Sequence, residues 1–139
     1  MLGDMTERSD GVLISSGRSS IRLTRGGEPN ELGYPTVIDV RAGPFQGAVQ
    51  DNLLDYGIFR TQLAELYASL RGDAKLGSYE GFKLDLIGNG TGGIGVSVKV
   101  IGDHVAPIHL KFGFGIDQSY LPAIIQQIDT EFPAPYRAF

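Results

Sequence analysis

The side chains best suited to acid–base chemistry are the two histidines of the chain, His104 and His109. Asp103 precedes His104, and a carboxylate beside an imidazole can orient a general base. The three residues could also offer ligands to a metal ion, but a recognisable site needs about four strong ligands at characteristic spacing. Asp is common in turns, and this pair falls between two expected strands. We therefore favour an exposed turn here and predict no catalytic or metal-binding residue.

A second pattern with chemical meaning is the segment Gly88–Gly93, which reads GNGTGG and matches the G-x-G-x-x-G spacing of dinucleotide-binding loops. That mechanism needs a helix after the loop, so that the helix N-terminus meets the pyrophosphate. Here residues 94–101 alternate between apolar and small or polar side chains, as in a strand, and Asn89-Gly90 is a common hairpin pair. We therefore predict a hairpin loop and no cofactor.

The elements that must position these residues follow the order ββββ-α-ββββ-α. The expected strands are 11–15, 19–24, 34–42, 45–50, 74–79, 82–87, 94–101 and 105–116. Apolar residues at helical spacing predict helices over 55–71 and 119–132, the first of them ended by Gly72. Short turns predict a single antiparallel sheet of about eight strands, with both amphipathic helices packed on one face. We expect a polar tail over residues 1–10 and a single α+β domain over residues 11–139.

The most informative side chains lie on the face of the predicted sheet opposite the apolar rows. They are Arg22, Asp39, Arg41, Lys83, Asp85, Ser97, Lys99, His109 and Lys111. Five are basic and two are acidic, whereas the whole chain carries a formal charge of −4. This face is either a basic recognition surface or a solvated face with cross-strand ion pairs. The candidate partner- or ligand-binding residues are Arg41, Lys83, Asp85, Lys99, His109 and Lys111.

Charge, hydropathy and cysteine content argue against several classes of protein. With 12 basic and 16 acidic side chains, the chain lacks the basic excess of a dedicated nucleic-acid binder. Its apolar runs are too short for a transmembrane helix, and its polar start is unlike a signal peptide. The absence of cysteine removes disulfides, thiolate metal sites and cysteine nucleophiles. We expect a cytoplasmic protein that binds neither nucleic acid nor membranes.

The stretch from residue 59 to residue 132 resembles the WapI-type bacterial immunity proteins and related uncharacterised domains. The segments that carry the resemblance are FRTQLAELYASL (59–70), GDAKL (72–76), EGFKLDL (80–86), VSVKV (96–100) and IDQSYLPAII (116–125). The resemblance implies a cytoplasmic protein that neutralises a polymorphic or contact-dependent toxin by binding it, with no cofactor. It assigns no toxin-binding residue.

Three functional hypotheses remain open from the sequence. The first is a non-enzymatic protein-binding domain, an immunity protein whose partner is a toxin domain. The second is a small enzyme or ligand-binding domain on the polar sheet face, with His109, Arg41 and Lys111 around an anionic ligand. It predicts a deep pocket at that face. The third is a structural subunit that forms a homodimer through an exposed edge strand.

Overall fold

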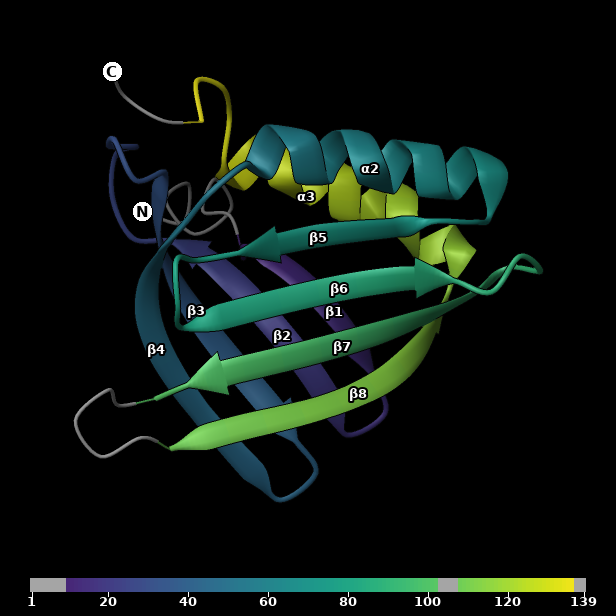
Figure 1. Ribbon diagram of the computed structural model, residues 1–139, viewed down its shortest axis with the longest axis horizontal. Coiled ribbons are helices and arrows are strands. Elements are labelled where there is room, and N and C mark those ends of the chain that lie inside the picture. Colours follow the sequence, from purple (N-terminus) through teal and green to yellow (C-terminus); the bar gives the residue numbers. More distant parts are fainter. Residues whose placement is uncertain (1–9, 103–107, 137–139) are drawn as a thin grey trace, which may run out of the picture.

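The computed structural model describes residues 10–102 and 108–136. Within these ranges the elements follow the predicted order (Figure 1). The strands are β1 (Val12–Ser16), β2 (Ser19–Arg25), β3 (Tyr34–Ala42), β4 (Phe45–Leu53), β5 (Asp73–Gly77), β6 (Phe82–Gly88), β7 (Gly93–Ile101) and β8 (His109–Asp117). The helices are α2 (Tyr56–Ser69), the short 3₁₀ helix η1 (Gln118–Tyr120) and α3 (Leu121–Glu131). Apart from Asp10, the predicted tail lies outside the described residues, as do Asp103 and His104.

The strands form two antiparallel sheets of four, in the orders β1-β2-β3-β4 and β5-β6-β7-β8. The α+β class is confirmed, but two sheets replace the single sheet that we expected. Eight strands side by side would span about 38 Å, whereas two packed helices cover about 20 Å. Two sheets of four can instead bury their apolar faces against each other. An isolated bridge between Leu54 and Gly77 links the end of β4 to β5.

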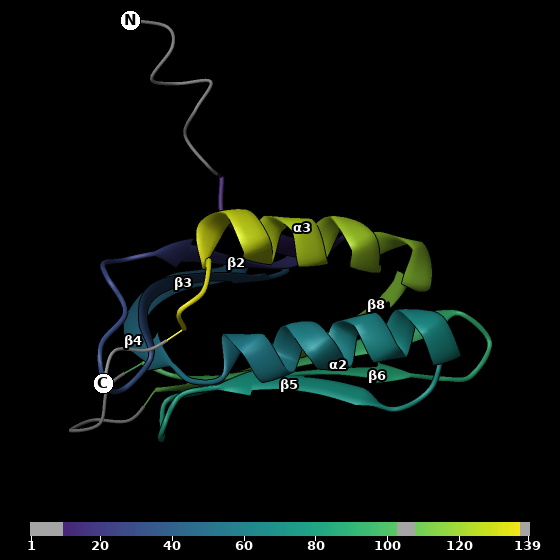
Figure 2. The same cartoon turned by 90° about the horizontal axis from the view of Figure 1, so that it is seen from above.

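The two helices close one side of the space between the sheets instead of covering a sheet face. Helix α2 contacts β5, helix α3 contacts β1, and the helices contact each other. Figure 2 shows them side by side, α2 along the sheet that contains β5 and β6, and α3 along the other. On the opposite side, between the edge strands β4 and β8, the described residues form no helix (Figure 1). Among the described residues, no helix has the length and apolar character needed to cross a bilayer.

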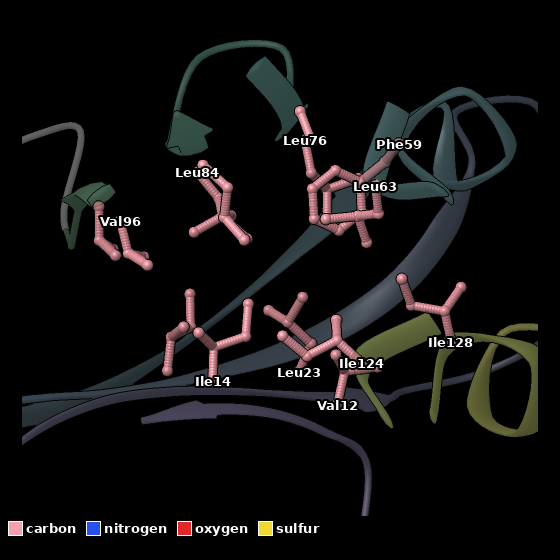
Figure 3. Packing of buried hydrophobic residues seen from close by; sticks show 14 of the residues in the cluster. Val12, Ile14, Leu23, Phe59, Leu63, Leu76, Leu84, Val96, Ile124 and Ile128 are labelled. Carbon is pink, nitrogen blue, oxygen red and sulfur yellow. The ribbon is translucent and has the colours of Figure 1, made fainter. Parts of the chain in front are cut away.

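The inner faces of both sheets and the apolar stripes of both helices share one core. Figure 3 shows their side chains directed into a common space. The labelled residues are Val12, Ile14, Leu23, Phe59, Leu63, Leu76, Leu84, Val96, Ile124 and Ile128. All ten are buried, with exposed fractions of 3% or less. The apolar residues of the two sheets and the two helices thus fill one common core.

An aromatic cluster ties β3, α2 and the end of α3 together. The rings of Tyr56 and Phe132 stack at 4.1 Å between centroids, and Tyr34 meets both rings edge-on. The Tyr34 hydroxyl donates to the carbonyl of Pro133, and the Tyr56 hydroxyl lies 3.0 Å from the Thr36 hydroxyl. Each buried hydroxyl therefore has a hydrogen-bond partner, as burial in an apolar core requires.

The glycine-rich segment forms the predicted hairpin between β6 and β7. The Asn89 side-chain oxygen accepts from the backbone N–H groups of Thr91 and Gly93, at 2.8 and 3.1 Å. A strand follows the loop where a dinucleotide site needs a helix. Helix α2 ends at Ser69, before the predicted Gly72, with Leu70 in the left-handed region at φ 64°. The hairpin packs directly against this helix end.

Candidate functional site

The most distinctive surface feature is three lysines that lie directly beside one another on β6, β7 and β8. Lys83 pairs in register with Lys99, and Lys99 pairs with Lys111. All three side chains are exposed and leave the outer face of the same sheet. Neighbouring strands are about 4.8 Å apart, so the three ammonium groups form a short positive strip. We call these three residues the lysine row.

The lysine row is not neutralised by ion pairs within the described part of the chain. The ion pairs found there are Arg25–Glu28, Arg60–Asp129 and Lys75–Asp73. None of them includes a lysine of the row. Like charges directly opposite each other destabilise an antiparallel sheet. The row therefore costs the free protein some stability, and on an acidic protein it is an unusual concentration of positive charge.

Asp85 lies one row further along the same face, between Lys75 on β5 and Ser97 on β7. Its Oδ1 atom is buried and has no hydrogen-bond partner in ranges 10–102 and 108–136. Burial raises the pKa of Asp85, the charge of Asp73 raises it further, and Lys75 opposes both. Asp85 thus keeps one carboxylate oxygen without a hydrogen bond in the row of residues next to the lysine row.

Of the other two predicted residues, His109 lies at the end of the lysine-bearing face and Arg41 lies on the other sheet. His109 is exposed at the start of β8 and pairs with Ile101. Arg41 lies on β3, where it pairs with Gln46. Arg41 faces a hollow of about 540 Å³ on the outer side of the first sheet, shared with Arg22 and Asp39.

The single polar face inferred from the sequence is therefore two outer faces, because the eight strands divide between two sheets. Residues 83, 85, 99, 109 and 111 remain together on one sheet, and Arg41 does not belong to that group. The arrangement of His109, Arg41 and Lys111 around one anionic ligand on an open sheet is not formed, since Arg41 and Lys111 lie on different sheets.

The face that carries the lysine row has little depth where the row crosses it. The hollow beside Lys83 and Lys99 has a volume of about 30 Å³. That is roughly the room for one or two water molecules. Pockets that enclose organic ligands measure about 300–1,000 Å³. This part of the face suits contact with another surface better than enclosure of a small molecule.

A larger apolar groove, of about 550 Å³, lies between β4 and β8 on the side without a helix. Phe45 and Ile108 line it and are 66% and 69% exposed. The groove was not predicted from the sequence, because both helices were expected to cover one face of a single sheet, which includes the apolar row Leu110, Phe112 and Phe114 of β8. These three are only half-buried in the structure. No sequence signal identified the groove, because it depends on β4 and β8 being the edge strands of two separate sheets.

Within residues 10–102 and 108–136, no group of three or more His, Asp or Glu side chains is placed to hold a metal ion. The electrostatics of the molecule otherwise stabilise the fold. The Arg60 guanidinium contacts both carboxylate oxygens of Asp129, joins α2 to α3, and holds the pKa of Asp129 below its usual range. Asp117 accepts a 2.8 Å hydrogen bond from the Ser119 backbone, which lowers the pKa of Asp117.

These features define an α+β protein of two stacked sheets and two helices, with a shallow charged sheet face exposed to solvent. Comparison with known families identifies its relationship: the Immunity protein WapI-like family matches residues 20–134. The chain therefore belongs to this family. The match includes most of the first sheet as well as the region of residues 59–132 on which the sequence resemblance rested. Neither the curated proteins nor the solved structures give a match.

Proposed function

We propose that this protein is an immunity protein that neutralises a polymorphic or contact-dependent toxin by binding it in the bacterial cytoplasm. The observation that carries the proposal is the family match over residues 20–134. Immunity families are generally non-enzymatic, and the proposal accordingly requires neither a catalytic residue nor a cofactor. The protein acts by occupying a surface that the toxin needs.

The surface geometry supports a protein partner. The face around Lys83, Lys99 and Lys111 is exposed, and the hollow beside the first two lysines is about 30 Å³. Protein interfaces are extended patches with a polar rim, and they do not need a deep cavity. Small-molecule sites bury most of the ligand in a concave pocket. A shallow charged face is therefore the better match to a protein than to a small substrate.

The proposal is tested by co-expression with polymorphic or contact-dependent toxin domains of the host strain, one at a time. The chain is induced from one plasmid and the toxin domain from a second, and growth is followed. We expect growth to be restored and the two proteins to co-purify. The control is the second plasmid with an empty first plasmid, with which the toxin domain should still stop growth. If the folded wild-type chain gives no protection and no complex, and instead shows turnover of a substrate, the proposal is overturned.

A further inference from the structure

We propose that the lysine row, Lys83, Lys99 and Lys111, is the docking surface for an acidic segment on the partner protein. This inference rests on the proposed function, because it names the chemistry by which an immunity protein of this shape would recognise its toxin. The partner is expected to present two or three carboxylates that lie along the row. The negative charge of these carboxylates selects the partner, and an enclosed pocket is not required.

The geometry of the row defines what can bind it. Three strands at about 4.8 Å spacing place the outer two lysine positions about 10 Å apart. Carboxylates at alternate positions of an extended segment lie about 7 Å apart. Lysine side chains have four flexible methylene groups, so the ammonium groups can adjust to that spacing. An acidic segment laid across β6, β7 and β8 can therefore pair with all three lysines.

The energetics favour such a partner. In the free protein the three adjacent cations repel one another, and in the described ranges none has an ion-pair partner. An acidic segment replaces this repulsion by attraction at no conformational cost to the sheet. Complementary charges of this kind mainly raise the association rate and select the binding orientation.

The charge of the rest of the molecule also favours binding of the acidic segment at the row. The chain has 12 basic and 16 acidic side chains, so the surface outside the three-lysine row is more acidic than the formal total of −4. An acidic segment is repelled by that surface and attracted to the row. The same balance disfavours a nucleic acid, whose long phosphate backbone would extend beyond the row over acidic groups.

A fourth lysine of the same sheet provides a control for the row. Lys75 lies on the same sheet face but already pairs with Asp73, at 3.4 Å. Removing Lys75 changes the net charge by one unit and leaves the row complete. A triple variant, Lys83→Ala with Lys99→Ala and Lys111→Ala, removes the row without touching the buried core. Because it relieves repulsion, this variant should melt at the wild-type temperature or slightly above it.

The first experiment titrates the ¹⁵N-labelled full chain with a six-residue glutamate peptide capped at both ends. At about 20 mM salt, where surface charges are weakly screened, we expect amide shifts centred on β6, β7 and β8. The triple variant should bind about tenfold more weakly, and Lys75→Ala should bind as the wild type does. Shifts scattered over all basic residues, an unchanged affinity in the triple variant, or tighter binding of a DNA duplex of equal charge would overturn the inference.

The second experiment uses the toxin domain and separates this inference from the proposed function. If wild-type protein binds the toxin and the triple variant loses at least about tenfold in affinity, both stand. If wild type and triple variant bind equally well, the immunity function stands and the docking surface is refuted. If wild-type protein fails to bind the toxin, the proposed function fails. The docking surface then fails with it if the peptide also leaves the row unshifted.

Discussion

The glycine-rich hairpin offers a sharp test of how this fold is assembled, because one of its glycines packs against the end of a helix. A Cβ atom added at Gly88 would lie 2.4 Å from the backbone oxygen of Leu70 and 2.7 Å from a methyl carbon of Leu66. Backbone atoms cannot move aside cheaply. Gly88→Ala must therefore push the β6–β7 hairpin away from the C-terminal end of α2.

The expected cost has two parts. Overpacking a closely packed contact costs about 1–3 kcal/mol. The displacement also weakens the 2.9 Å hydrogen bond from the Gly90 backbone N–H to the Leu70 carbonyl, which contributes about 1 kcal/mol. Together they predict a loss of about 2–4 kcal/mol in the free energy of unfolding. For a chain of this size that corresponds to a fall of about 10 °C in Tm.

The matched control is Gly95→Ala on the neighbouring strand β7. A Cβ atom there would lie 3.8 Å from the Ile87 carbonyl oxygen, which is an ordinary van der Waals contact. Gly95→Ala should change the free energy of unfolding by less than about 0.5 kcal/mol. Urea unfolding followed by circular dichroism measures both variants, with the m-value as a check on the unfolded state. Equal stability of the two variants would refute the close packing of Gly88 against α2.

Three further substitutions test other parts of the account. Burial raises the pKa of Asp85, so the ionised form of this side chain destabilises the fold at neutral pH. Asp85→Asn should therefore raise the free energy of unfolding at pH 7 by about 1 kcal/mol. That gain should vanish below about pH 4, where the aspartate is protonated in both states. Arg60 lowers the pKa of Asp129, so the stability from this exposed pair is present at neutral pH and is lost as the pH falls below about 4. Asp129→Asn should therefore cost at most about 1 kcal/mol at pH 7, less in high salt, and progressively less in acid. Phe132→Ala should cost about 3–5 kcal/mol in urea unfolding, because the ring is fully buried against Tyr56; a cost below about 1 kcal/mol would contradict the aromatic cluster.

Local sequence patterns were sufficient to predict the elements and the faces of the strands. Period-two alternation identified the outward positions of Lys83, Lys99 and Lys111. The strand pattern that follows Gly88–Gly93 identified this segment as a hairpin. Alternation states which side chains share a face of one strand. It does not state which strands share a sheet. The division into two sheets depends on how much apolar area two helices can cover, which is a property of the whole chain.

The candidate site shows the same limit. Two lysines become neighbours only when the strand register is known, and a shift of one residue would place Lys99 opposite an inward-facing position. The register between β6 and β7 is set by the loop after Gly88, whose length the sequence leaves uncertain by a residue. Arg41 was grouped with the lysines because one continuous sheet was assumed. Its separation follows from the two-sheet packing and from nothing in its immediate sequence.

The central claim is that this protein neutralises a toxin by binding it. The most direct measurement titrates the purified chain into purified toxin domains of the host strain, one at a time, while the toxic activity is recorded. We predict that the activity falls in proportion to the added chain and is abolished at about one chain per toxin domain, with a stable complex on gel filtration. Undiminished toxic activity in the presence of excess folded chain, with no complex formed, would contradict the claim.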